Sequence, residues 1–190
     1  MPAKPRRNLW RSLLFLAGII AFLWVLEIVD QFFLHQSLNR FGIVPRNWIG
    51  LRGIALSPFL HVSFTHLAAN TVPLFVLGAM VLLRSTRDFV GVTFLAMLVG
   101  GLGVWLFGAS GSCHIGASGV IFGYFGFLIA AAWFERGFLS IITALVVILL
   151  YGGLIWGVRP FQGHVSWLGH LFGMLGGVAA AYLRADSKKA

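Results

Sequence analysis

The sequence predicts an all-α, polytopic membrane protein with six transmembrane helices. Hydrophobic residues make up 59% of the 190-residue chain and charged residues only 10%, whereas an ordinary soluble domain has about 25% charged residues. The apolar runs reach the roughly 20 residues that a helix needs to cross a bilayer, and they do not alternate as membrane β-strands do. A soluble enzyme, a disordered chain and a disulfide-stapled secreted domain, which needs more than the single Cys113, are excluded.

The six expected spans are separated by short segments that carry most of the charge. They cover about residues 10–34, 58–83, 89–107, 115–134, 138–157 and 164–183. The first is predicted to be a retained helix and not a signal peptide, because its apolar stretch continues past Trp24 to Glu27 without a small-residue cleavage site. We expect one membrane domain over residues 1–190, with a short basic cytoplasmic tail at about 1–9.

The basic residues predict the orientation in the cell (inner) membrane. Six spans put both termini on one side, and a cytoplasmic placement leaves ten basic residues inside and four outside, as the positive-inside rule requires. Those inside are Lys4, Arg6, Arg7, Arg11, Arg84, Arg87, Arg136, Arg184, Lys188 and Lys189, and those outside are Arg40, Arg46, Arg52 and Arg159. The outer loops are then 35–57, 108–114 and 157–163, and the longest is expected to form short helices at the membrane surface. No nucleic-acid partner is expected, because the basic residues form no dense tract.

Two polar residues fall at matching depth in separate spans. Ser118 and His170 each lie on the order of 10 Å below the outer surface at the helical rise per residue. Glycines at three- and four-residue steps flank both, and they allow the two backbones to approach closely. A serine becomes a nucleophile when an adjacent base takes its proton, and histidine is the usual base. The pair predicts a two-residue catalytic site, since no carboxylate lies at this depth; alone, each residue would indicate helix packing.

A third span carries two further polar residues that enter from the same side. His66 and Asn70 are four residues apart and therefore share one helix face. An acyl-transfer site needs hydrogen-bond donors aimed at the developing oxyanion. The Asn70 amide, the His66 ring N–H and the Ser118 backbone N–H can supply them. The alternative is that His66 and Asn70 only bond to neighbouring helices.

Three ordered motifs resemble those of the rhomboid family of intramembrane serine proteases over a core of about residues 40–183. They are His-x4-His-x3-Asn at His61, His66 and Asn70, Gly-x-Ser-Gly at 116–119, and Gly-His-x2-Gly-x3-Gly at 169–177. The resemblance implies a rhomboid-like bundle of the basic bacterial six-helix type. It also implies an outward-open, water-filled cavity that is capped by the loop near 157–163.

The same resemblance implies a role for each motif residue. Ser118 would be the nucleophile, His170 the general base and acid, and His66 and Asn70 the oxyanion ligands together with the Ser118 amide. His61 would support the long first loop, and the remaining supporting residues would be Gly116, Gly119, Phe122 and Gly173. No cofactor and no metal ion are implied. The partners would be the lipid bilayer and single-span membrane proteins, which the family cuts near the outer end of their helix after a small residue.

Two positions depart from the family pattern. Leu51-Arg52-Gly53 stands where many members carry a Trp-Arg pair, and Phe122 stands where many carry a tyrosine that stacks on the base. Neither change removes a reacting group, so an active protease is expected.

Two alternatives from other classes stay open. A catalytically inactive, rhomboid-like binding protein would be expected to lack Ser118 or His170. A His-lined transporter or metal-binding protein is disfavoured, because Glu27 and Asp30 are the only nearby acids and no two histidines are four residues apart. The sequence leaves the substrate and the oligomeric state open.

Overall fold

A computed structural model describes residues 9–160 and 166–187, and this part of the chain is helical without a β-strand. The helices are α1 (Leu9–Phe32), α2 (Gly53–Leu56), α3 (Phe64–Arg84), α4 (Thr86–Phe107), α5 (Ser118–Glu135), α6 (Phe138–Tyr151) and α7 (Trp167–Asp186). Four 3₁₀ helices join them: η1 (Ser37–Phe41), η2 (Trp48–Arg52), η3 (Ser57–Phe59) and η4 (Gly152–Val158). The all-α prediction is confirmed for the described residues. The predicted tail at 1–9, cap at 157–163 and beginning of the last span at 164 lie largely or partly outside them.

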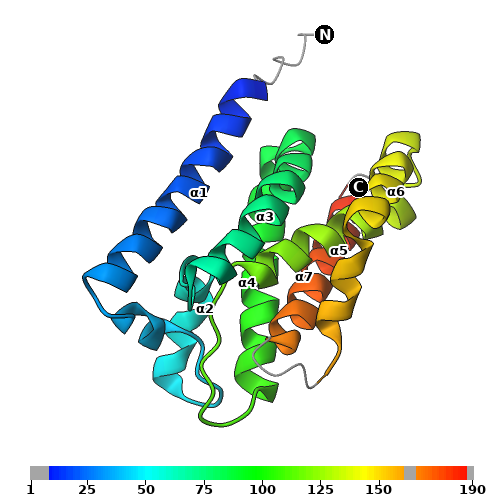
Figure 1. Cartoon of the computed structure of the whole chain (residues 1–190). Helices are drawn as coiled ribbons and strands as arrows, with labels where there is room; N and C mark the ends of the chain where they lie inside the picture. Colours follow the sequence, from blue (N-terminus) through cyan, green and yellow to red (C-terminus); the bar gives the residue numbers. More distant parts are fainter. Residues whose placement is uncertain (1–8, 161–165, 188–190) are drawn as a thin grey trace.

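Five described helical segments are long and apolar enough to cross a membrane: α1, α3, α4, α5 and the run Phe138–Val158 of α6 and η4. α7 has 20 residues and corresponds to the sixth predicted span, but its composition is less apolar. It packs most extensively against α5 and α4, and its buried residues are His170, glycines and alanines. Figure 1 shows α7 running beside both helices. Helix α7 is therefore less apolar because protein, and not lipid, surrounds much of it.

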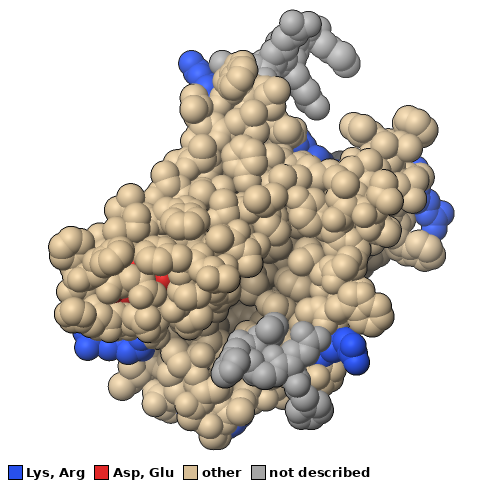
Figure 2. Space-filling model, viewed as in Figure 1, with Lys and Arg blue, Asp and Glu red and all other residues tan. Residues whose placement is uncertain are grey.

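The surface has the pattern expected of a membrane protein. On the face shown in Figure 2, the blue basic side chains lie near the margins of the molecule, and the broad area between them is almost entirely uncharged. Large apolar side chains are exposed on several helices, among them Trp10 and Phe22 of α1, Trp133 near the end of α5, and Leu149 of α6. Such a surface is stable in contact with lipid.

Two of the helix beginnings that differ from the prediction follow a local capping signal. Helix α3 begins at Phe64, six residues later than expected, because Pro58 lies in the separate turn η3 and the Ser63 hydroxyl accepts from the His66 N–H at 3.2 Å. Helix α4 begins three residues earlier, where Ser85 accepts from the Asp88 N–H at 3.4 Å. The predicted span 138–157 is formed by α6, which ends at Tyr151, and by η4, which continues it from Gly152 to Val158.

The first loop forms short helices, as predicted, and is docked on the bundle. Ile43 and His114 exchange two backbone hydrogen bonds of 2.9 Å, which fix the loop to the segment that precedes α5. The Trp105 indole N–H donates to the Asn47 carbonyl at 2.8 Å, and the Arg46 guanidinium donates to the Leu106 carbonyl at 3.0 Å. The loop is thereby held at the end of the bundle where α5 and α7 begin.

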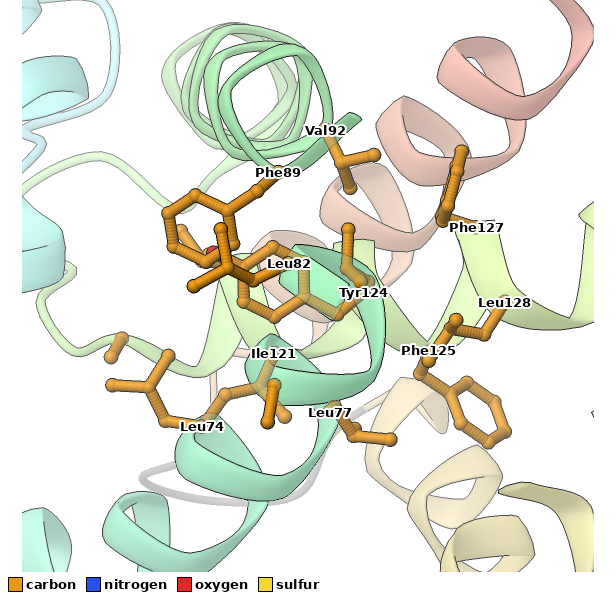
Figure 3. Close-up of a cluster of buried hydrophobic side chains, with 14 of the residues drawn as sticks. Leu74, Leu77, Leu82, Phe89, Val92, Ile121, Tyr124, Phe125, Phe127 and Leu128 are labelled. Carbon is orange, nitrogen blue, oxygen red and sulfur yellow. The ribbon is translucent and has the colours of Figure 1, made fainter. Parts of the chain in front are cut away.

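Helix α5 forms the centre of the bundle. Its Tyr124, Phe127 and Leu128 are almost fully buried and join the apolar cluster drawn in Figure 3. Against α7 the contact is made by backbone: a Cβ placed on Gly173 would overlap the Gly119 carbonyl oxygen, and one on Gly177 would overlap that of Gly123. We call this contact the α5–α7 seam. The glycine faces predicted from sequence therefore do allow the close approach that they were expected to allow.

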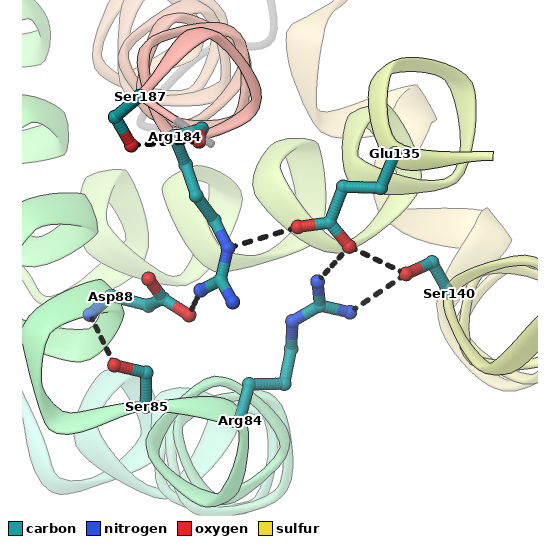
Figure 4. Close-up of polar contacts among 7 residues, drawn as sticks. All are labelled: Arg84, Ser85, Asp88, Glu135, Ser140, Arg184 and Ser187. Atoms are coloured by element: carbon teal, nitrogen blue, oxygen red, sulfur yellow. Dashed lines mark hydrogen bonds and ion pairs between the residues drawn. The ribbon is translucent and has the colours of Figure 1, made fainter. Parts of the chain in front are cut away.

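A network of ion pairs connects the helices at the opposite end of the bundle. Glu135, at the end of α5, pairs with Arg84 at 2.6 Å and with Arg184 Nε at 2.9 Å, and Arg184 also pairs with Asp88. The Ser140 hydroxyl donates to Glu135 at 2.7 Å. Figure 4 shows these side chains converging from five helices. The ends of α3, α5 and α7 and the beginnings of α4 and α6 therefore lie together, as the alternating topology requires.

Candidate active site

Ser118 and His170 are in direct contact across the α5–α7 seam. Ser118 is the first residue of α5, and His170 lies in the first turn of α7. The Ser118 Oγ is 2.8 Å from His170 Nε2, and the imidazole is 8% exposed. The two residues that the sequence placed at matching depth are thus within the range required for proton transfer.

The Gly157 carbonyl oxygen lies 2.9 Å from His170 Nδ1 on the other side of the ring. A carbonyl oxygen only accepts, so in the neutral imidazole Nδ1 carries the proton and donates it to Gly157. Nε2 is then the acceptor, and the Ser118 hydroxyl donates to it. Gly157 was not foreseen from sequence, because a backbone carbonyl in a 3₁₀ turn has no residue signature; the preceding glycines at 152 and 153 are its only hint.

Phe122 fixes the plane of the same imidazole. It lies one turn after Ser118, and its ring stacks on His170 with centroids 4.1 Å apart and planes 5° apart. An added Cβ on Gly157 would come within 2.7 Å of Phe122 Cζ and 3.1 Å of His170 Nδ1. Gly157 is therefore packed against both rings, and a larger residue would displace one of them.

His61 forms a hydrogen bond with the turn that precedes Ser118. It is almost fully buried, and its Nε2 lies 3.4 Å from the Ala117 backbone nitrogen, where it accepts the N–H. Burial, together with the nearby His66, lowers the pKa of His61 to about 4, so that the ring is neutral and able to accept. The hydrogen bond of His61 is thus to the serine-bearing segment, whereas the family resemblance implied support of the first loop.

Gly116 makes room for His66 and Asn70. Its φ of +119° is strained for other residues, and its N–H donates to the Ser57 carbonyl at 2.8 Å. A Cβ there would lie 2.9 Å from His66 Nε2 and 3.8 Å from Asn70 Nδ2. The nitrogens of both side chains therefore converge beside the backbone that leads into Ser118.

Asn70 has an unused hydrogen-bond donor. Its side-chain Nδ2 is buried and makes no hydrogen bond within the described part of the chain, and the same holds for His66 Nδ1. The Ser118 backbone N–H is also unused by its own helix, because the first four N–H groups of an α-helix have no carbonyl partner in it. Buried donors without partners are rare in proteins, so the Asn70 amide and the Ser118 N–H can donate to a further acceptor.

A cavity of about 310 Å³ opens beside these groups. Asn70, Ser118, Phe122, Gly157 and His170 line it, together with residues of α3, α5 and η4. His66 is not among the described residues that line it, and its ring lies next to Gly116. Asn70, Ser118 and His170 therefore face the same cavity, and His66 lies beside it.

A second serine–histidine pair lies nearby and differs in its bonding. Ser112 Oγ is 2.8 Å from His114 Nε2, but the Ser112 hydroxyl donates to the Ala109 carbonyl at 2.6 Å, and His114 Nδ1 is 2.7 Å from Ser166 Oγ. Burial lowers the pKa of His114. Because the Ser112 proton is directed to a carbonyl, this pair is not arranged for proton transfer. Within residues 9–160 and 166–187, no three His, Cys, Asp or Glu side chains converge as a metal site would require.

Comparison with known proteins identifies the family. A family model of the rhomboid domain matches residues 49–187, which is most of the chain. The chain belongs to the rhomboid family. It is a multi-pass membrane protein with an all-helical described part, and the matched region contains all the residues of the candidate site.

Individual relatives of this rhomboid chain include proteins with and without a described activity. An uncharacterized protein of Mycobacterium tuberculosis is 43% identical over 180 residues, which cover 90% of this chain and 75% of the relative. The rhomboid protease GluP of Bacillus subtilis is 30% identical over 173 residues, which cover 88% of this chain and 33% of GluP. The putative rhomboid protease YdcA of the same organism is 27% identical over 131 residues, which cover 68% of this chain and 65% of YdcA.

Proposed function

We propose that this rhomboid is an intramembrane serine endopeptidase in which Ser118 is the nucleophile and His170 the general base. The observation that carries the proposal is the 2.8 Å contact between Ser118 Oγ and His170 Nε2, with Nδ1 held by Gly157. In the neutral ring this leaves the lone pair of Nε2 directed at the serine proton. The proposal is also supported by the named rhomboid proteases among the relatives.

The reaction follows from these positions. Ser118 Oγ attacks the scissile carbonyl carbon while its proton passes to His170 Nε2, and a tetrahedral oxyanion forms. The Asn70 Nδ2 donor and the Ser118 N–H stabilise that oxyanion, with His66 adjacent as a further donor. His170 then protonates the leaving amine, and the peptide bond breaks to give an acyl-enzyme. Water, deprotonated by the same ring, attacks the ester and releases the second product.

The proposed substrates are single-span membrane proteins, cut near the end of the bundle where α5 and α7 begin. In the proposed orientation this end faces outward, and both termini lie in the cytoplasm of a cell whose inner membrane holds the protein. The ion-pair end carries Arg84, Arg87, Arg136 and Arg184, which agrees with the positive-inside rule. Single cysteines replacing Arg136 and Arg159, in a Cys113→Ser background, should react with impermeant reagents from opposite sides; reaction from one side would refute this topology.

The decisive experiment combines cleavage and labelling. Purified full-length protein is incubated with a generic single-span substrate, and in parallel with a fluorophosphonate probe. Wild type should cleave and be labelled at Ser118, Ser118→Ala should do neither, and His170→Ala should lose most of both. Ser112→Ala is the matched control, since Ser112 also contacts a histidine, and it should behave as wild type. Labelling that persists in Ser118→Ala would refute the assignment, and an inert wild type would favour an inactive, substrate-holding protein.

A further inference from the structure

A second cavity lies at the ion-pair end, far from the proposed nucleophile. It has a volume of about 420 Å³ and is formed between α4 and α7, with a contribution from Phe127 of α5. We call it the α4–α7 groove. Its lining changes along its length: Ser85, Arg87, Asp88, Arg184 and Ser187 lie at one end. Figure 4 shows four of these, Ser85, Asp88, Arg184 and Ser187, on the facing helix ends.

The polar end of the groove has a positive charge that its own acids do not neutralise. Asp88 is occupied by Arg184, and Arg184 is shared with Glu135. Arg87 is exposed and forms no ion pair with any residue that the structure describes. It stands in the first turn of α4, where the helix dipole also favours an anion. The groove therefore offers one uncompensated guanidinium to a negatively charged group.

The other end of the groove is apolar. Val92, Leu95, Ala180 and Leu183 line it, and Gly91 leaves a gap in the α4 side of the wall. A Cβ placed on Gly91 would meet no atom within 4 Å, so the glycine is not required for helix packing. The gap is therefore open space that an alkyl chain can fill, directly below the basic rim.

We propose that the α4–α7 groove binds one anionic glycerophospholipid of the phosphatidylglycerol type. Its phosphate would lie at Arg87 and the outer edge of Arg184, and one acyl chain would follow Gly91, Leu95 and Leu183. Basic pockets between helices on the cytoplasmic side of a membrane are suited to such headgroups, because the inner leaflet is rich in anionic lipid. The site is distinct from the candidate active site; it rests on the proposed orientation in the membrane and not on the proposed protease activity.

The test measures lipid binding to the full-length protein by native mass spectrometry after exchange into neutral detergent. Three ligands are titrated: dioleoyl phosphatidylglycerol, dioleoyl phosphatidylcholine and inorganic phosphate. Wild type should retain one phosphatidylglycerol at least tenfold more tightly than phosphatidylcholine. Equal affinity for the two lipids would overturn the proposal, and so would displacement of the lipid by millimolar phosphate, which would indicate a simple anion site.

Matched variants locate the site. Arg87→Gln should weaken phosphatidylglycerol binding about five- to tenfold, as expected for the loss of one basic contact, and Arg87→Lys should restore most of it. Arg136→Gln, at the same end but outside the groove, should bind as wild type. Gly91→Leu should weaken both lipids, whereas Gly18→Leu, which also adds a side chain in open space, should not. Thermal unfolding of each variant verifies the fold, and equal losses in Arg87→Gln and Arg136→Gln would refute the assignment.

Discussion

The Gly157 carbonyl oxygen accepts a hydrogen bond from His170 Nδ1 at 2.9 Å. A carboxylate performs this task in three-residue catalytic triads, where it holds the correct tautomer of the histidine. Here a backbone group does so, and it carries no full charge. The imidazole is therefore oriented as in a triad, but the imidazolium of the proposed reaction would gain less electrostatic stabilisation from its partner.

Gly157→Ala should lower the turnover number by one to two orders of magnitude. The added methyl group would lie 2.7 Å from Phe122 Cζ and 3.1 Å from His170 Nδ1, so one of the two stacked rings must shift. Such a shift changes the position of the base relative to Ser118, and misplacement of about 1 Å costs about 10²-fold. Gly153→Ala is the control, because a Cβ at Gly153 meets no atom within 4 Å. Initial rates on one substrate measure the effect. Equal activity of both variants would show that the methyl group at position 157 does not displace the base, since the carbonyl that bonds Nδ1 is kept in both.

Asn70→Ala should remain folded and reduce turnover by about 10²–10³-fold, the effect of removing one oxyanion donor. In a Ser118→Ala background it should cost almost nothing further, because groups that act in one step are not additive. If Asn70 only bonded neighbouring helices, its loss would instead lower the unfolding temperature and leave turnover per folded molecule normal. Rates and unfolding temperatures measured on the same preparation distinguish the two. His66→Ala should have the smaller effect on rate, since His66 does not line the described cavity.

Stability should fall as the pH is lowered from about 6.5 toward about 4. Burial lowers the pKa of His61 in the folded protein from the ordinary 6.5 to about 4, so in this window the unfolded chain binds the proton and the folded chain does not. The contribution of His61 is therefore fully present above pH 6.5 and is lost as the pH falls. His61→Gln keeps an acceptor for the Ala117 N–H without titrating, and its unfolding temperature should vary less steeply with pH over this window. Parallel slopes for the two proteins would contradict this.

Glu135→Gln should destabilise the protein without changing turnover per folded molecule. It removes the partner that Arg84 and Arg184 share, and these side chains are only 10–22% exposed. The cost should lie between the about 1 kcal/mol of exposed pairs and the about 3–5 kcal/mol of buried ones. Asp186→Asn, an exposed acid at the same end of α7, should change little. A variant as stable as wild type would show that the network adds no net stability.

Sequence patterns predicted those features that depend on composition and spacing. The apolar runs located the long helices, the glycine steps predicted the α5–α7 seam, and equal depth paired Ser118 with His170. Hydropathy is a weaker guide to the last helix, α7. This helix is surrounded largely by protein, so it does not need the strongly apolar surface that lipid contact requires, and its glycines, alanines and histidine lower its mean hydropathy.

Features that depend on the rotation of a helix about its axis or on a backbone atom were not predictable. From the sequence, Arg84 and Arg184 indicated only the orientation of the protein in the membrane. Their shared ion pair with Glu135 was not predictable, because it depends on how five helices are rotated relative to one another. The contact of Gly157 with His170 was not predictable either, because it is made by a backbone carbonyl, which every residue has. The beginning of α3 was missed because Pro58 belongs to η3 and the Ser63 cap competes with a longer apolar run.

The α5–α7 seam should keep the distance between Ser118 and His170 independent of bilayer thickness. Where a side chain fills a helix interface, the helices can slide by repacking it, but Gly119 against Gly173 and Gly123 against Gly177 leave no side chain to repack. Helices α1 and α6 bury only four and three residues, respectively, so they can tilt to match a thinner or thicker membrane at small cost. The distance from Ser118 to His170 should then stay constant across membranes of different thickness, and thickness should alter how substrates reach the cavity and not the chemical step.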